Sequence, residues 1–508
     1  MRTLALSDEI LMQVEKPARY IGGEINAVMK DPEAVKVRFA MCFPDVYEIG
    51  MSHLGIQILY GMLNSYEDVW CERVYSPWVD LDAIMRKEQI PLFALESQDP
   101  IRTFDFLGIT IQYEMCYTNI LQVLDLSGIP LLAKERTEED PIVIGGGPCT
   151  YNPEPVCDFF DLFYIGEGET RYRELIDLYE DCRSRGLSRQ DFLKKAACIP
   201  GIYVPSLYEV SYHEDGTIKE IKPLEEGIPE RILKEMVTEV SDTYYPDKPV
   251  VPFIKVTQDR VVLEIMRGCI RGCRFCQAGQ LYRPVRERDV EFLKKYAIAM
   301  LENTGHEEIS LSSLSSSDYQ KLPELIDFLI EECSRRKVNI SLPSLRIDAF
   351  SLDVMNKVQD VKKSSLTFAP EAGSQRLRNV INKGLTEEVI LQGAKLAFEG
   401  GWTRVKLYFM LGIPFETEED IQGIAELCNK IAAEFYDTVP KEKRNGRVQI
   451  VASTSFFIPK PFTPFQWAPQ CRKEDFLNKA YLTRTAIMSQ LNQKSIKYNW
   501  HEADASVM

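Results

Sequence analysis

The chain has 508 residues and a hydrophobic content of 45%, which predicts more than one folded domain. Its net charge of −16 argues against a broad nucleic-acid-binding face, because such faces are basic. Most of its cysteines stand singly in apolar stretches, as reduced cytosolic thiols do. We find neither a membrane-length apolar run nor a secretory signal, so we expect a cytoplasmic protein without membrane partners.

Residues 1–34 are polar and mixed, and we expect a helical lead-in there. Over residues 35–180, strands alternate with helices. We expect strands at VKVRFAMCF and at 91–95, 106–112, 141–144 and 162–165, and helices at 50–63, 80–87 and 117–127. This order predicts an α/β domain with a flavodoxin- or Rossmann-like doubly wound sheet, which binds ligands beyond the carboxyl ends of its strands.

Two glycine clusters lie at such strand ends. Gly145 and Gly146 follow the apolar run PIVI, and Gly166 and Gly168 follow LFYI just before a helix. Glycine at a strand end lets a ligand approach the backbone closely, but tight turns also use glycine. A ligand site and plain turns therefore both stay open.

A second domain is expected over residues 253–470, after a connecting segment at 181–252 with an Asp-Gly hairpin at 208–223. Beyond an apolar run that ends near residue 264, we expect strands at 308–314, 338–342, 364–368, 404–411 and 449–456. Helices are expected at 290–304, 321–337, 351–358, 387–399 and 417–435. Six such units predict a partial (β/α)6 TIM-type barrel with its active face at the strand carboxyl ends. Residues 471–508 are expected to form a helical extension.

Three cysteines, Cys269, Cys273 and Cys276, follow the first strand of this domain in the spacing C-x3-C-x2-C. A structural zinc site needs a fourth ligand, and an electron-transfer cluster normally takes four cysteines. A [4Fe-4S] cluster with one open iron needs only three. The alternatives are a zinc loop completed by His306 or a distant cysteine, and reduced core thiols. The arginines around the loop are expected to offset the negative charge of a metal centre.

With Phe275 before the last cysteine, this motif resembles that of the radical S-adenosylmethionine (SAM) enzymes. The resemblance implies that the open iron binds the amino and carboxylate groups of SAM. One electron then cleaves SAM to methionine and a 5′-deoxyadenosyl radical. Phe275 is expected to cover an aromatic part of the ligand.

The other candidate SAM contacts lie where later barrel strands end. Ser312 and Ser313 end the second strand, where they either contact SAM or cap the next helix. Arg346 follows the third strand and either binds a carboxylate or ribose or pairs with Asp348. Glu371 lies in the sequence FAPEAGS, which resembles the E-x-G-S loop of the branch with methylthiotransferases and implies a cofactor contact.

The fifth strand ends in GIPFETE, which contains Gly412 and Pro414. This stretch resembles one in the same branch whose backbone packs on adenine, and Thr417 also fits the start of a capped helix. Both roles are compatible.

Taken together, the glycine clusters at residues 145–147 and 166–168 resemble the cobalamin-binding-like domain that precedes the radical SAM core in one large branch. The resemblance leaves a bound cobalamin open, with Gly145, Gly146, Gly166 and Gly168 facing it. His53 lacks the Asp and Gly that accompany a cobalamin-ligating histidine, and a helix cap or core position is the stronger interpretation.

The whole pattern resembles a family of radical SAM proteins with an amino-terminal cobalamin-binding-like domain. It implies an enzyme that binds a [4Fe-4S] cluster, takes electrons from a donor such as flavodoxin or ferredoxin, and starts radical chemistry on an unknown small or macromolecular substrate. Methyl or methylthio transfer is one outcome. A non-catalytic iron-sulfur protein and an RNA-modifying enzyme remain the alternatives, the second disfavoured by the acidic charge.

Overall fold

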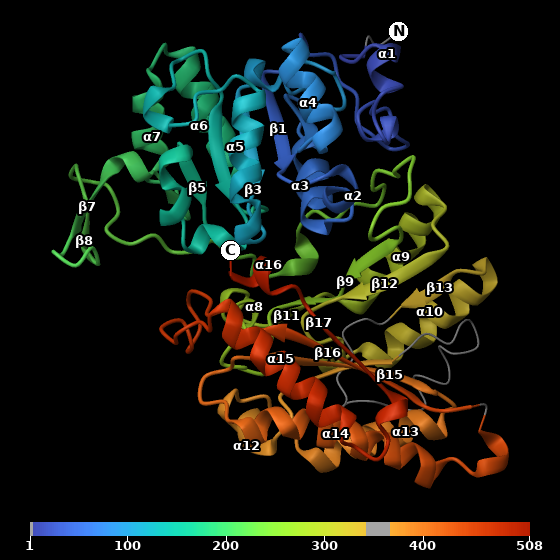
Figure 1. The fold of residues 1–508 in the computed structure, drawn as a ribbon. Coiled ribbons are helices and arrows are strands. Elements are labelled where there is room, and N and C mark those ends of the chain that lie inside the picture. Colours follow the sequence, from blue (N-terminus) through green and yellow to red (C-terminus); the bar gives the residue numbers. More distant parts are fainter. Residues whose placement is uncertain (1–3, 342–365, 445, 508) are drawn as a thin grey trace. The chain divides into compact units, whose positions relative to one another are not determined.

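Six strands of the amino-terminal half form one sheet (Figure 1). The computed structural model describes residues 4–341, 366–444 and 446–507. The strand order is β2-β1-β3-β4-β5-β6, in which β1 to β5 are parallel and β6 is antiparallel to β5. The strands are β1 (Val37–Phe43), β2 (Val69–Tyr75), β3 (Phe106–Thr110), β4 (Ile142–Gly146), β5 (Leu162–Tyr164) and β6 (Ile202–Tyr203). The expected doubly wound sheet is confirmed.

Helices cover both faces of this sheet. Successive residues of β1 alternate between two buried clusters, because side chains along a strand point to opposite faces. The cluster with Phe39 includes residues of α3 (Leu54–Asn64), α6 (Tyr172–Ser184) and α7 (Arg189–Ala196). The cluster with Ala40 includes residues of α4 (Val79–Glu88) and α5 (Tyr117–Leu126). Two short helices, α1 (Asp8–Leu11) and α2 (Tyr47–Gly50), complete the helices before α3.

One strand of this sheet was predicted in the wrong place. Residues 91–95 form no strand and contribute only a bridge between Phe93 and Pro100, whereas the edge strand β2 spans Val69–Tyr75. Its sequence VWCERVY is fully buried although it contains two charged residues. Arg73 pairs with Glu24 at 2.7 Å and with Glu96 at 2.6 Å. Partners so distant in sequence leave no local strand signal.

Residues Met1–Asp259 with Ala299–Gly305 make one unit, and Arg260–Ile298 with His306–Met508 make the other. The first unit also contains the hairpin predicted at 208–223, formed by β7 (Tyr208–Tyr212) and β8 (Ile218–Pro223). Residues 4–34 contribute buried side chains such as Leu6 and Tyr20 to its core.

The described strands of the second unit form two parallel sheets, with no closed barrel among them. One has the order β13-β12-β9 and the other β14-β15-β16-β17. The strands are β9 (Val261–Glu264), β12 (Glu308–Ser312), β13 (Asn339–Ser341), β14 (Leu366–Glu371), β15 (Arg404–Leu411), β16 (Gln449–Phe456) and β17 (Ile496–Trp500). Two short antiparallel strands, β10 (Met266–Arg267) and β11 (Arg286–Glu287), form a hairpin that encloses residues 268–285. The parallel β/α core of the prediction is thereby confirmed.

The helices that follow β9 lie between strands, as predicted, apart from the last one, and the end of the helix at Val290–Thr304, from Ala299 on, belongs to the first unit. These helices are α8 (Ala278–Leu281), α9 (Val290–Thr304), α10 (Leu322–Arg336), α12 (Gln375–Val380), α13 (Glu387–Glu399), α14 (Glu418–Thr438), α15 (Lys473–Met488) and α16 (Ala503–Val507). The helix predicted at 351–358 lies outside the described residues. The expected helical extension at 471–508 needs one correction, because Ile496–Trp500 forms the parallel edge strand β17 beside β16.

Candidate functional site

The three cysteines lie on a loop that leaves β10 and returns through β11. Two glycines shape this loop, with φ of 86° at Gly268 and 69° at Gly272. A Cβ atom on Gly268 would lie 2.6 Å from the carbonyl oxygens of Tyr282 and Pro284. Only glycine satisfies both demands there, so the backbone of the cysteine loop depends on it. We call residues 268–277 the cysteine loop.

The thiols of this loop differ in exposure. Cys273 is buried, whereas Cys269 and Cys276 are partly exposed. The Gly279 N–H donates a hydrogen bond to Cys276 Sγ at 3.3 Å. Burial raises the pKa of the Cys276 thiol, while the Gly279 N–H and the Lys383 ammonium lower it. Among the described residues, no three His, Cys, Asp or Glu side chains gather closely enough to hold one metal ion. This applies to Cys269, Cys273 and Cys276 themselves as well as to a zinc loop with His306.

The end of α12 fastens the cysteine loop. The Arg274 N–H donates to the Ile381 carbonyl at 3.0 Å, and the Arg274 side chain donates to the Val380 carbonyl. Asn382, with φ of 52°, donates from Nδ2 to the Gly272 carbonyl at 2.9 Å. These bonds flank Cys273 on both sides. We call residues 379–383 the bracket; no sequence motif pointed to it.

The bracket ends in Lys383, which pairs with Glu371. Lys383 Nζ lies 3.1 Å from Glu371 Oε1, and the side chains are 11% and 16% exposed. The same nitrogen lies 5.9 Å from the centroid of the Phe275 ring. Glu371 sits in an irregular end of β14 with φ of 69°. Burial raises the pKa of Glu371, and Lys383 opposes that rise. The structure therefore brings Phe275 and Glu371 together, and adds a lysine that the sequence analysis missed.

Arginines in and around the cysteine loop form ion pairs with acidic side chains of the protein. Arg267 and Arg288 pair with Glu264 at 3.0 Å and 2.7 Å. Burial alone would raise the pKa of Glu264, but the two guanidinium groups hold it below its usual value. Arg271 Nε donates to Asp318 in the loop after β12 at 2.9 Å. The arginines that we expected to balance a metal centre thus also hold the loop to its surroundings.

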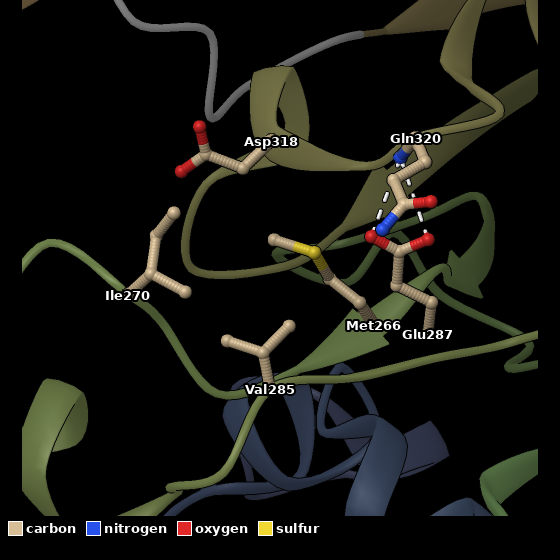
Figure 2. A pocket seen from close by; sticks show the side chains of 6 residues that line it. All are labelled: Met266, Ile270, Val285, Glu287, Asp318 and Gln320. Atoms are coloured by element: carbon tan, nitrogen blue, oxygen red, sulfur yellow. Dashed lines mark hydrogen bonds between the residues drawn. The ribbon is translucent and has the colours of Figure 1, made fainter.

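A pocket of about 460 Å³ lies beside the cysteine loop. Figure 2 shows its lining, which comprises Met266, Ile270, Val285, Glu287, Asp318 and Gln320. The apolar side chains come from the loop and its hairpin, and the polar ones lie around them. The Gln320 N–H donates to Glu287 at 3.3 Å. This volume lies in the range of small-molecule sites.

The remaining predicted SAM contacts are Ser312 and Ser313 where β12 ends, Arg346, and the turn with Gly412 and Pro414 after β15. The Ser312 carbonyl accepts the Ile265 N–H at 3.0 Å, and the Ser313 hydroxyl lies 2.9 Å from that of Ser316. Arg346 lies outside the described residues.

Gly412, at the end of β15, has φ of 81° and donates its N–H to Glu416 at 3.0 Å. Glu416 also pairs with Lys479 at 2.8 Å. Pro414 lies between them in the same turn, and Thr417 forms the predicted capping box with Asp420. The loop is therefore held by internal contacts at both ends.

The four glycines predicted to face cobalamin lie at the ends of β4 and β5, in the first unit. A Cβ atom would lie 2.5 Å from the Phe163 ring at Gly145, 2.1 Å from the Glu235 carbonyl at Gly166 and 2.9 Å from Leu59 at Gly168. Only Gly146 among these four has no atom within 4 Å of that position. Three of them thus serve packing within the chain.

His53 caps α3, where its Nδ1 accepts the Ile56 N–H at 3.3 Å. Burial lowers the pKa of His53 to about 4. The cap interpretation is therefore confirmed. Among the helices described, none is long and apolar enough to cross a membrane.

Two family models match the chain. One, described as the radical SAM superfamily, matches residues 263–428, which contain the cysteine loop and the bracket. The other, described as the amino-terminal part of radical SAM proteins, matches residues 55–205.

Curated relatives extend over most of the sequence. The uncharacterised protein MJ0966 of Methanocaldococcus jannaschii is 31% identical over 430 residues, which are 84% of this chain and 78% of that protein. An uncharacterised methyltransferase, PH0819 of Pyrococcus horikoshii, is 24% identical over 65% of both chains. A threonylcarbamoyladenosine tRNA methylthiotransferase, MtaB of Aquifex aeolicus, is 24% identical over 44% of this chain and 56% of that protein.

Two solved structures share the fold. The radical SAM methyltransferase TsrM of Kitasatospora setae, solved with cobalamin and a [4Fe-4S] cluster, matches 85% of this chain and 77% of its own with a TM-score of 0.55 and 13% identity. The cobalamin-dependent radical SAM enzyme OxsB matches 91% of this chain and 58% of its own with a TM-score of 0.53 and 14% identity. At these identities the likeness concerns the fold.

Proposed function

Because the chain is an enzyme that belongs to the radical SAM superfamily, we propose that Cys269, Cys273 and Cys276 hold a [4Fe-4S] cluster at which SAM is cleaved reductively. The observation that carries this proposal is the cysteine loop itself, whose three thiols stand at a strand end. Three protein thiolates leave one iron for a small molecule, unlike the four-cysteine set of an electron-transfer cluster. The bound cluster and SAM would supply a carbon-centred radical for hydrogen abstraction.

The protein's own residues fit that cluster. The Gly279 N–H already donates to Cys276 Sγ, and such hydrogen bonds to cluster ligands stabilise thiolate charge. The bracket holds the loop on both sides of Cys273. Phe275 packs against a small apolar cluster that includes Leu377 and Ile381. These contacts hold the loop backbone on both sides of Cys273 and place Phe275 against that apolar cluster.

The pocket beside Ile270 supports ligand binding next to the cysteine loop. Its apolar wall and its polar rim suit a molecule that carries both kinds of group. We assign this pocket to SAM or to the substrate. A protein donor such as flavodoxin or ferredoxin would supply the electron, and we place the reaction in the cytoplasm, where thiols stay reduced.

Methyl or methylthio transfer is the reaction class that we favour. It is supported by the relatives named as a methyltransferase and a tRNA methylthiotransferase. The tRNA relative keeps an RNA substrate as the second candidate, although the net charge of −16 disfavours it. Reductive cleavage of SAM at the cluster does not require cobalamin. The fold likeness to TsrM and OxsB supports it as a further cofactor, but three of the four candidate glycines are packed by the chain itself.

The decisive experiment is anaerobic purification followed by iron and sulfide analysis. Protein reconstituted with iron and sulfide would then be incubated with SAM and dithionite, and 5′-deoxyadenosine measured. We expect a cluster and 5′-deoxyadenosine, both absent when all three cysteines are replaced by alanine. A cluster without 5′-deoxyadenosine above that control would favour the non-catalytic alternative, and one tightly bound zinc per chain would overturn the proposal.

A further inference from the structure

We propose that the buried Lys383–Glu371 pair sets the reduction potential of the cluster held by the cysteine loop, with the lysine on the cluster side. This inference rests on the proposed function. In this inference, the charges of Lys383 and Glu371 act on the cluster through their electrostatic field. Neither side chain contacts the substrate.

Lys383 is fixed beside the cysteine loop. Its N–H donates to the Arg378 carbonyl at 2.9 Å, and its ammonium group is held by Glu371 at 3.1 Å. The ammonium lies 5.9 Å from the ring of Phe275, the residue that directly precedes Cys276. The bracket also bonds to Gly272 and Arg274. Loop and lysine are therefore parts of one hydrogen-bonded arrangement, and their separation is constrained.

The other cations near the loop are also ion-paired or lie in solvent. Arg267 pairs with Glu264 in surroundings as buried as those of Lys383, with side chains 10% and 18% exposed, and Arg271 pairs with Asp318. Arg274 is exposed to solvent, where water and salt screen its charge. Lys383 is only 11% exposed and Glu371 only 16%. Charges in such surroundings interact over several ångströms with little screening.

The sign of the effect follows from charge. Reduction adds one electron, taken from an external donor, to a centre that already carries three thiolates. A nearby cation therefore favours the reduced cluster, and a nearby anion favours the oxidised cluster. The two members of the pair should act in opposite directions. A pair that served only to hold the fold would give the same result whichever member was replaced.

The test uses opposite replacements in the full-length protein. Lys383→Met removes the cation, Glu371→Gln removes the anion at nearly constant shape, and Lys383→Arg keeps the positive charge. Lys430 and Glu387 form a matched but more exposed pair at 2.6 Å, so Lys430→Met and Glu387→Gln make the same changes in net charge. Each protein is reconstituted and checked for iron and sulfide content and thermal unfolding. The ratio of reduced to oxidised cluster is then measured by electron paramagnetic resonance at a fixed solution potential, without SAM.

We expect Lys383→Met to lower this ratio about tenfold and Glu371→Gln to raise it severalfold. Tenfold corresponds to about 59 mV for one electron. Lys383→Arg and both control variants should stay within about twofold of the unmodified protein. The inference would be overturned if Lys383→Met and Glu371→Gln changed this ratio in the same direction, or by no more than the control variants do. It would also be overturned if these two variants lost the cluster while the control variants kept it. If the unmodified protein takes up no cluster, the proposed function itself fails.

Discussion

Asn382 donates a hydrogen bond from its side-chain nitrogen to the Gly272 carbonyl at 2.9 Å, across 110 residues of sequence. This bond joins the end of α12 to the middle of the cysteine loop. It fixes the backbone next to Cys273, although none of the three cysteines takes part in the bond. The geometry of the candidate metal centre therefore depends on a residue far from the motif.

Replacing Asn382 by glycine should weaken metal retention more than stability. Glycine tolerates the φ of 52° at this position, so the change removes the hydrogen bond without adding strain. We expect an unfolding free energy lower by about 1 kcal/mol and several-fold faster loss of iron to a chelator.

The control is Asn64→Gly in the other unit. It removes the hydrogen bond from Asn64 Nδ2 to the Cys71 carbonyl at 2.9 Å and the one from the Cys71 N–H to Asn64 Oδ1 at 3.0 Å. It should lower stability, by bond loss and helix propensity, and leave iron retention unchanged. Equal iron loss in the two variants would contradict a specific role for the bracket.

Gly268→Ala should prevent the cysteine loop from adopting its fold. The new methyl group would lie 2.6 Å from two carbonyl oxygens in a backbone with φ of 86°. We expect a loss of several kcal/mol and little bound iron, measured by thermal unfolding and by iron analysis.

Gly305→Ala provides the comparison, because Gly305 has φ of 70° but no atom within 4 Å of its Cβ position. Its cost should be about 1 kcal/mol, with iron unaffected. If the two substitutions behaved alike, backbone strain alone and not the close approach would explain the effect.

Acid should destabilise the first unit through His53. The pKa of His53 is lowered from 6.5 to about 4 by burial, so between these values the unfolded chain binds more protons than the folded one. Stability therefore rises with pH across this window and is lost as pH falls through it. The effect should be on the order of 3 kcal/mol, because one pKa unit corresponds to about 1.4 kcal/mol.

His53→Asn should flatten this pH dependence, because asparagine can also cap α3 but does not titrate. Thermal unfolding from pH 4 to 7 measures it. The exposed His213 serves as control, and His213→Asn should leave the slope intact. A slope that survives His53→Asn would assign the acid sensitivity to other groups.

Gly166→Ala should unfold the edge of the first sheet while Gly146→Ala is tolerated. A Cβ atom at Gly166 would lie 2.1 Å from the Glu235 carbonyl, whereas nothing approaches Gly146. We expect the free energy of unfolding to fall by more than about 3 kcal/mol in Gly166→Ala and by less than ~0.5 kcal/mol in Gly146→Ala. Melting temperatures measure both changes.

Gly146 and Gly166 also allow a test of cobalamin binding. Packing at Gly166 leaves the Cβ position of Gly146 open, and loss of hydroxocobalamin on gel filtration of the unmodified protein would show that no corrin binds there. Stoichiometric retention, abolished by Gly146→Ala, would show instead that this edge is a corrin site.

Gln320→Trp should obstruct the pocket beside the cysteine loop. Its hydrogen bond to Glu287 comes from the main chain, so the substitution leaves that bond in place. We expect formation of 5′-deoxyadenosine to fall at least about fivefold with unchanged cluster content. Gln320→Ala, which widens the pocket, should retain most activity. Unchanged turnover in the Trp variant would remove this pocket from the path of SAM and substrate.

Features formed within a few consecutive residues were predictable from the sequence. The strands Arg404–Leu411 and Gln449–Phe456 and the helix Glu387–Glu399 were predicted with the bounds that the structure has. Their apolar periodicity is read from neighbouring residues. The spacing of the cysteines and the E-x-G-S stretch likewise identified the loop and Glu371, because such motifs lie within a few residues.

Features that depend on residues far apart in the chain became apparent only in the folded structure. The buried strand Val69–Tyr75 went unpredicted because Arg73 depends on Glu24 and Glu96 for its charge balance. The strand Ile496–Trp500 became visible only beside β16. Asn382 and Lys383 gained their roles by reaching Gly272 and Glu371. A buried charge or an unpaired donor is stable only when its partner arrives, and folding supplies partners that sequence order does not show.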